Sequence, residues 1–376
     1  MKLETKFNKI IAAVLLLLAA AAVWYLSTQF LSMRENEPIY PQAGTEKKML
    51  SDWYDGLKGT AADTEVYIIR GKEEGGSMLV LGGTHGNEPS GLVAATLLLE
   101  NAKMEAGTLY VIPRANLLGL TCTDPQEAAP MRFTISTPGG DRWFRFGSRA
   151  SNPVFQWPDP DIYVHKSSGQ RLSGSETRNL NRAYPGRTDG TLTEKIAYGV
   201  AELIRAEKID IEVDLHEASP EYPTINAIVA HERAMDIAAE AKIWMEVDGI
   251  DISIESSPKN LHGLTHRELG DYTDTLALLM ETANGSQGRL RGATNEELVV
   301  TGKDKYYVKA AEYGRLYVPY DENGHPISER VARHITGIMQ FAEAFTGMGD
   351  RPIIIGGIPT YGEMLADLGP YLDPTD

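Results

Sequence analysis

The sequence predicts an α/β fold: a mixed, mostly parallel sheet with helices on both faces, preceded by an N-terminal membrane helix. Short apolar strands alternate with helical segments, the pattern of a sheet covered on both faces. The composition, 42% hydrophobic and 23% charged, is that of a packed globular domain. The first thirty residues differ from this composition and are treated separately.

Residues 10–26 carry no charge and follow three lysines, Lys2, Lys6 and Lys9. A helix of this length covers about 25 Å, and residues 28–33 can extend it toward the thickness of a bilayer. Lysines on the N-terminal side predict that this end stays inside the cell. We therefore expect residues 1–32 to be a signal anchor that crosses the cell membrane once, with the remainder outside the cytoplasm. The alternative is a cleaved signal peptide, cut near residues 19–22, which would give a secreted protein.

Residues 33–50 are charged, contain two prolines and show little periodicity, which is typical of a tether. We expect one domain over residues 51–350 and a C-terminal extension over 351–376. Within the domain, apolar runs predict strands and 3.6-residue periodicity predicts helices. The expected strands are 66–70, 77–83, 108–113, 209–215, 226–230 and 275–280, and the expected helices are 90–102, 193–208, 232–246 and 329–345.

An insertion of about residues 121–174 interrupts this pattern, because it is rich in proline and in aromatic residues. A loop of that length is uncommon and is often a lid or a binding element. A surface excursion packed on its own aromatic side chains is the other interpretation, and both stay open.

Charge and cysteine content exclude several classes of protein. The chain has 36 basic and 52 acidic residues, a formal charge of −16, so a nucleic-acid partner is not expected. The single cysteine, Cys122, cannot form an internal disulfide, and no cluster of cysteines could hold a structural metal.

A possible metal site lies where predicted strands end. His85 and Glu88 form an H-x-x-E pair between a strand and a helix, and His216 follows another apolar strand. Open α/β sheets bind ligands outside the carboxyl ends of their strands. Imidazole and carboxylate groups are zinc ligands, and a catalytic zinc takes three of them. We expect one Zn²⁺ per chain, held by these three residues.

Two more groups could take part in chemistry. Glu281 ends the apolar run 276–280 and could accept a proton from water. The segment 171–182 gathers Arg171, Arg178 and Arg182 beside Asn181, and a guanidinium can capture a carboxylate through two hydrogen bonds. A second arginine could stabilise an oxyanion.

These motifs resemble the succinylglutamate desuccinylase/aspartoacylase family, a branch of the zinc carboxypeptidase clan. The resemblance rests on residues 82–91 (GGTHGNEPSG), 112–116 (IPRAN), 179–186 (NLNRAYPG), 214–216 (DLH) and the segment around Glu281. It implies a carboxypeptidase-like sheet and a zinc bound by His85, Glu88 and His216.

The resemblance also implies roles for the remaining candidates. Glu281 would be the general base and acid, and Asn181 and Arg182 would bind a substrate carboxylate. Arg171 would stabilise the oxyanion, with Arg178 as the alternative.

The expected function is a zinc-dependent hydrolase that cleaves an amide bond near a carboxylate, outside the cytoplasm. Its partner would be a small molecule or a short peptide, so an N-acyl amino acid deacylase and a carboxypeptidase-like peptidase both stay open. A non-catalytic protein that binds carboxylated ligands on the same fold is the alternative from another class. No G-x-S-x-G motif supports a serine hydrolase.

Overall fold

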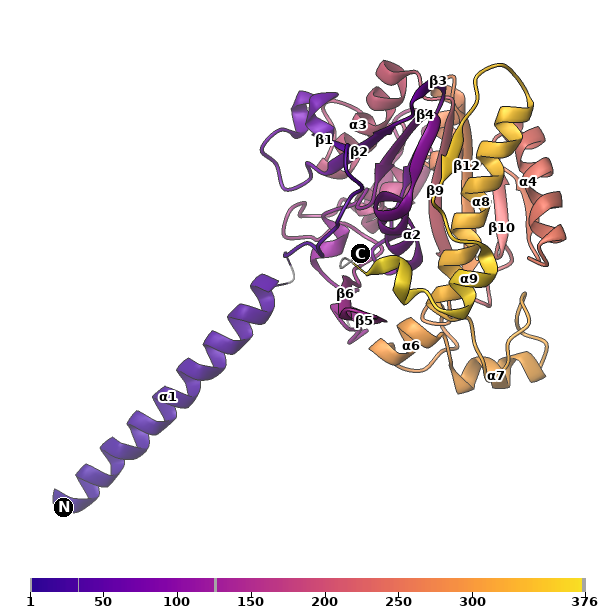
Figure 1. Cartoon of the computed structure of the whole chain (residues 1–376). Helices are drawn as coiled ribbons and strands as arrows, with labels where there is room; N and C mark the ends of the chain where they lie inside the picture. The colour runs from indigo at the N-terminus through magenta and orange to yellow at the C-terminus, as the bar shows by residue number, and fades with distance from the viewer. Residues whose placement is uncertain (1, 33, 125–126, 374–376) are drawn as a thin grey trace. The chain divides into compact units, whose positions relative to one another are not determined.

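The computed structural model describes residues 2–32, 34–124 and 127–373 (Figure 1). The first residue of the expected anchor, residue 33 of the tether, 125–126 of the insertion and 374–376 of the extension lie outside this description. The chain divides into two compact units, Met1–Glu37 and Pro38–Asp376.

The first unit contains one long helix, α1 (Lys2–Ser32). Its segment Lys6–Ser32 contains a window of 18 residues with a mean hydropathy of 2.5 and is long and apolar enough to cross a membrane. Length and composition alone qualify it, as they would a signal sequence.

The second unit is built on one central sheet, which confirms the predicted α/β class. Its strands follow the order β1-β2-β4-β3-β9-β12-β10-β11, and β13 pairs with β4. The four adjacent strands β4, β3, β9 and β12 are parallel, and antiparallel strands flank them. The strands are β1 (Glu46–Met49), β2 (Glu65–Arg70), β3 (Glu73–Leu81), β4 (Lys103–Ile112), β9 (Ile211–Ala218), β10 (Ala227–Ala230), β11 (Ser253–Ser256), β12 (Leu276–Ala283) and β13 (Ile354–Gly356).

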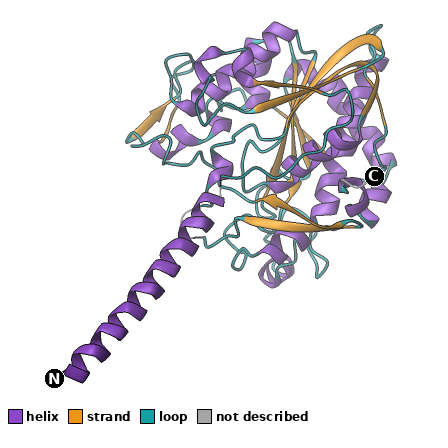
Figure 2. Cartoon of the chain, turned by 60° about the vertical axis from the view of Figure 1, so that its left-hand side comes forward, coloured by secondary structure: helices purple, strands orange, loops and turns teal. Residues whose placement is uncertain are grey.

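Helices cover both faces of this sheet (Figure 2). One core lies between the sheet and the helices α2 (Pro89–Asn101), α4 (Met235–Val247) and α8 (Ile327–Gly347). The other lies under α3 (Leu192–Glu207) and α5 (Thr265–Tyr272). The shorter helices are α6 (Glu296–Thr301), α7 (Lys305–Glu312) and α9 (Tyr361–Ala366).

Strand β9 shows why polar residues reach the interior. Side chains alternate between the two faces of a strand. Ile211, Val213 and Leu215 enter the core under α2 and α8. Asp214 and His216 therefore face the α5 side, although the whole strand is buried. The apolar face packs the strand into the core, and the other face presents the polar side chains of the candidate site.

The first and the last described segments of the second unit are hydrogen-bonded to its α2 and β4. In the stretch expected to be a tether, the Tyr40 N–H donates to Glu100 Oε1 at 2.8 Å and the Gln42 N–H to the Leu99 carbonyl at 2.9 Å. In the expected C-terminal extension, β13 pairs with β4, and the Asn101 side chain donates to the Tyr371 carbonyl at 2.8 Å. The compact unit thus begins at Pro38 and includes the described C-terminal residues.

The insertion has secondary structure of its own. It forms two antiparallel hairpins, β5 (Arg132–Thr137) with β6 (Gly140–Arg145), and β7 (Ile162–Val164) with β8 (Arg171–Ser173). Phe133 and Phe144 stack on one another inside the first hairpin and join the core under α2. This hairpin is therefore packed against the domain.

Candidate metal centre and active site

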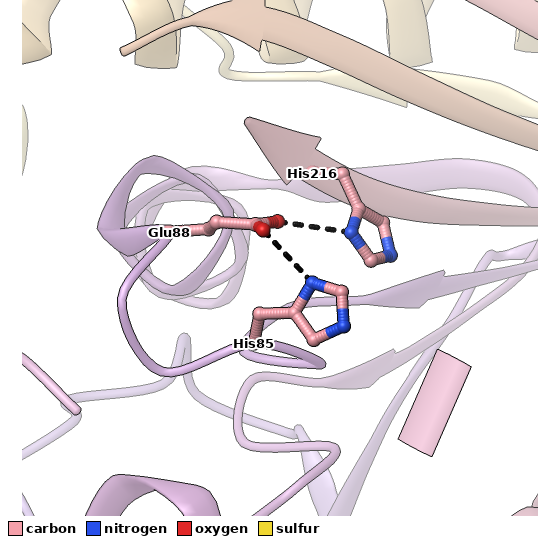
Figure 3. Close-up of side chains that lie close together, drawn as sticks. All are labelled: His85, Glu88 and His216. Carbon is pink, nitrogen blue, oxygen red and sulfur yellow. Dashed lines mark hydrogen bonds and ion pairs between the residues drawn. The ribbon is translucent and has the colours of Figure 1, made fainter. Parts of the chain in front are cut away.

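The candidate site lies at the carboxyl ends of the parallel strands β3, β9 and β12. His85 and Glu88 lie on the link from β3 to α2, and His216 lies near the end of β9. Figure 3 shows the two imidazole rings turned toward the Glu88 carboxylate. His85 Nδ1 lies 2.8 Å from Glu88 Oε1, and His216 Nδ1 lies 2.9 Å from Glu88 Oε2. Potential ligand atoms of all three residues lie within 4.8 Å of one another, and all three are buried.

The second nitrogen of each ring also has a partner. His85 Nε2 lies 2.9 Å from Asn179 Oδ1, and His216 Nε2 lies 2.7 Å from Asp214 Oδ2. The Asn179 amide has a defined orientation, because its Nδ2 donates to Glu176 at 2.7 Å and its Oδ1 accepts the Asn181 N–H. Each imidazole thus lies between two acceptors.

This arrangement fits a cation. Burial, with the nearby charge of Arg149, lowers the pKa of His85 to about 4, so its ring is neutral near pH 7 and has one N–H. One of its two acceptors is then left without a proton. With a cation held between His85 and Glu88, the ring would need only one hydrogen, on Nε2, which it would donate to Asn179. Two imidazoles and a carboxylate are also the donor set of catalytic zinc sites.

His216 differs from His85 because a carboxylate lies behind it. Although burial opposes it, the Asp214 and Glu88 carboxylates raise the pKa of His216 well above its usual value. Asp214 is itself held by the hydroxyls of Thr84 and Thr265, at 2.7 and 2.9 Å. Such a supporting carboxylate orients a metal-binding imidazole and increases its basicity.

Glu281 lies beside His216, because β12 runs parallel to β9 and the two residues are in register. It is partly buried, and its Oε2 has no hydrogen-bond partner among the described residues. Burial raises the pKa of this carboxyl to about 8, with the neighbouring Glu88 carboxylate contributing. An unpaired carboxyl of raised pKa beside three potential ligands is suited to proton transfer.

Arg182 and Asn181 lie near this cluster. Burial and the charge of Arg149 lower the pKa of Arg182, and Glu281 acts on it in the opposite direction. The Arg182 side chain donates to the Asn181 carbonyl at 2.6 Å and lies 4.0 Å from Glu176. The Asn181 side-chain oxygen accepts the Thr265 N–H at 3.0 Å, so it fixes the start of α5.

The other two arginines expected at the site have different surroundings. Arg178 binds Asp159 through two hydrogen bonds of 2.7 and 2.9 Å and donates to the Ser151 carbonyl. Arg171 is exposed on β8. Within the described part of the chain, no hydrogen bond or ion pair joins either guanidinium to His85, Glu88 or His216.

Arg149 was not expected from the sequence, yet it reaches the cluster. Its Nη1 lies 3.2 Å from Glu88 Oε1 and 3.4 Å from His85 Nδ1, and 43% of its side chain is exposed. It belongs to the insertion, which contains four other arginines. No periodicity or motif marks it. Asn179 was also missed, although it lies in the motif 179–186.

The insertion brings Arg149 to the site through the loop that carries His85. The Gly147 N–H donates to the Gly86 carbonyl at 2.6 Å, and the Gly86 N–H donates to the Ser148 carbonyl at 2.8 Å. The backbones approach so closely that a Cβ on Gly86 would lie 2.8 Å from the Gly147 Cα. Asp124 adds a second connection, because it accepts the Arg149 N–H at 3.2 Å and an Asn87 side-chain hydrogen at 2.8 Å.

Comparison with known proteins gives similarity at the level of structure. No family model matches the chain, and no curated protein matches its sequence. An aspartoacylase family protein from Mesorhizobium loti MAFF303099 aligns with 67% of this chain and 66% of its own at 18% identity, with a TM-score of 0.40. A succinylglutamate desuccinylase from Silicibacter sp. TM1040 aligns over 79% and 63%, at 16% identity and a TM-score of 0.42.

A metallo-carboxypeptidase from Burkholderia cenocepacia aligns over 86% of this chain and 69% of its own, at 11% identity and a TM-score of 0.46. The chain thus spans about two thirds or less of the length of the first two proteins. Proteins of the family that the sequence motifs resemble are among those to which this chain is similar.

Proposed function

We propose that the chain is a metal-dependent hydrolase that cleaves an amide bond close to a carboxylate. The observation that carries this proposal is the buried cluster of His85, Glu88 and His216 beside the unpaired carboxyl oxygen of Glu281. We propose one Zn²⁺ per chain, held by these three side chains. When bound, the ion would polarise the substrate carbonyl and lower the pKa of water.

Two residues of the chain would carry out proton transfer and charge stabilisation. Glu281 takes a proton from the attacking water and returns it to the leaving amine, for which a carboxyl whose pKa is above its usual range is suited. Arg149 stabilises the negative charge that develops on the carbonyl oxygen, because its guanidinium reaches Glu88 and is partly exposed to an incoming substrate. We favour it over Arg171 and Arg178 for this role.

Substrate recognition is proposed for Arg182. Its guanidinium is largely buried and carries its charge beside Glu281, so a substrate carboxylate bound there would place the neighbouring amide near the base. Asn181 supports this role by holding α5 through Thr265. The substrate class is N-acyl amino acids or peptides with a free terminal carboxylate.

We further propose that α1 anchors the chain in the cell membrane, with the second unit outside the cytoplasm. The length and apolar composition of α1 support this proposal. Cleavage after this segment would give a secreted form instead.

The test uses the full chain in detergent. Zinc content is measured first, and hydrolysis is then followed for N-acyl amino acids and short peptides, each beside a matched substrate whose carboxylate is a methyl ester. We expect turnover that stops in chelator, returns with zinc and is much lower for the esters. Tight binding of the carboxylates without turnover would identify a binding protein and contradict the hydrolase.

A further inference from the structure

Glu217 follows His216 on β9, but its side chain points to the opposite face of the sheet. Side chains alternate along a strand, so Glu217 faces α8 and His216 faces α5. Its carboxylate is fully buried and forms an ion pair with Arg330 of α8, Nη1 to Oε1, at 2.6 Å. An ion pair so deeply buried is costly unless its groups find partners, and among the described residues Arg330 Nε is the one group of the pair that has none.

One partner of this ion pair lies in the segment that carries Glu88, and another follows the strand that carries Glu281. Glu217 Oε2 accepts the N–H of Ser90, two residues after Glu88, at 3.2 Å. The same oxygen accepts a side-chain hydrogen of Asn284, just beyond β12, at 3.2 Å. Arg330 also donates to the Val299 carbonyl in α6.

The main chain of Glu217 completes the connection. Its N–H donates to Glu88 Oε2 at 3.1 Å, the same oxygen that faces His216 Nδ1. Glu217 therefore binds the segment of Glu88 twice, once through its backbone and once through its side chain. Neither Glu217 nor Arg330 faces the site, yet together they fix the start of α2 against the end of β9.

We propose that the buried Arg330–Glu217 ion pair is a positioning device that sets the separation between Glu88 and His216, and so the metal affinity of the site. The inference rests on the metal site of the proposed function. It assigns a role to α8, which contributes no ligand. Residues that orient metal ligands from behind typically change affinity by about 10- to 100-fold when replaced.

A matched control exists at the C-terminal end of α2, the helix whose start is held by Glu217. Glu100, near the C-terminal end of α2, forms a nearly buried ion pair with Arg142, with distances of 2.6 and 2.7 Å. Arg142 also donates to the carbonyls of Leu372 and Pro38. This pair attaches α2 to the ends of the second unit, and no described contact joins it to the ligands.

The experiment measures zinc affinity by competition with a chromogenic chelator and, separately, resistance to urea, for the full chain in detergent. The variants are Arg330→Met, the double variant Glu217→Met with Arg330→Met, and the control Arg142→Met. The double variant replaces the whole ion pair by apolar side chains, an exchange that proteins often tolerate, so it remains folded even where the single variant does not.

We expect zinc affinity to fall about 10- to 100-fold in the Arg330 variants. Arg142→Met should lose stability and keep the affinity of the parent. Parental zinc affinity in the folded double variant would overturn the inference and leave the proposed function intact. A parent chain that takes up no zinc would instead overturn the proposed function, and this inference with it.

Discussion

The two histidines of the candidate site share one carboxylate but differ in what lies behind them. His216 stands on a strand, and its second nitrogen faces the Asp214 carboxylate. His85 stands on a loop, and its second nitrogen faces the Asn179 amide. The pKa of His216 is raised well above its usual value, whereas that of His85 is lowered to about 4. Both rings are buried, so the two pKa values are separated by the neighbouring charges, Arg149 beside His85 and Asp214 behind His216.

The two sides of the site also differ in how they are built. On the sheet side, the register of β9 and β12 places Asp214, His216 and Glu281 on one face. On the insertion side, separate loops bring Asn179 and Arg149 to His85. We therefore expect the sheet side to determine metal affinity and proton transfer. We expect the insertion side to determine how strongly the negative charge of the transition state is stabilised.

The largest effect should come from Glu281 on the sheet side. Glu281→Gln removes the proton acceptor without altering a proposed ligand, so turnover should fall by about 10²–10⁴-fold while zinc affinity stays near that of the parent. Initial rates and zinc content measure the two quantities. Glu297→Gln, an exposed carboxylate of α6, is the control and should behave as the parent. Turnover at the parental rate in Glu281→Gln would remove Glu281 from the mechanism.

Arg149 tests the insertion side. Arg149→Ala should lower kcat by about 10²–10³-fold, the loss typical of an oxyanion donor. Arg149→Lys should recover part of it, because the charge returns without the planar fork. Arg171→Ala is the matched variant and should keep the parental kcat. The opposite pattern, with the loss in Arg171→Ala alone, would restore the assignment made from the sequence.

The comparison of the two supporting groups can be measured directly. Asp214→Asn removes the charge behind His216, and we expect zinc affinity to fall about 10- to 100-fold. Asn179→Ala removes a neutral hydrogen-bond acceptor behind His85, together with its bonds to Glu176 and Asn181, and the fall should be about 5-fold. Zinc competition titrations of both variants give the ratio. Equal losses would mean that charge behind the ring has no special effect.

A buried histidine outside the cluster gives the smallest effect. Burial lowers the pKa of His334 from 6.5 to about 3, and His334 is fully buried in α8. Its folded pKa lies below the unfolded value, so its contribution to stability is present above pH 6.5 and is lost as the pH falls toward 3. His334→Leu cannot take up this proton.

Between pH 7 and 5.5, the metal-free parent should therefore lose about 1 kcal/mol more free energy of unfolding than His334→Leu. Urea titrations in chelator at the two pH values measure the difference. An identical loss in both proteins would show that His334 does not contribute to acid sensitivity.

The sequence identified the three strands that carry the sheet side of the site. Apolar runs identified β3, β9 and β12, and a polar residue at the end of a buried strand is conspicuous. His85, Glu88, His216 and Glu281 could therefore be named before their distances were known, and the structure brings the three proposed ligands together.

The insertion side could not be predicted in the same way. Arg149 reaches Glu88 only because Gly147 pairs with Gly86 and Asp124 holds the following residues, contacts between loops that no periodicity encodes. Arg178 lies in a cluster that suggests a binding site, but its charge is taken up by Asp159. Hairpin β5–β6 was missed for a related reason, since its strands belong to a small sheet separate from the central one.

The close approach of Gly86 to Gly147 limits how this part of the molecule can diverge. A methyl group on either glycine would collide with the opposite backbone, so both positions tolerate hydrogen alone. Hairpin β5–β6, over residues 132–145, precedes Gly147 and contains none of the proposed ligands, so its turn could be exchanged while the contact between Gly86 and Gly147 is kept. A replacement turn could give the site a new specificity, provided that the chain after it still pairs with Gly86 through Gly147.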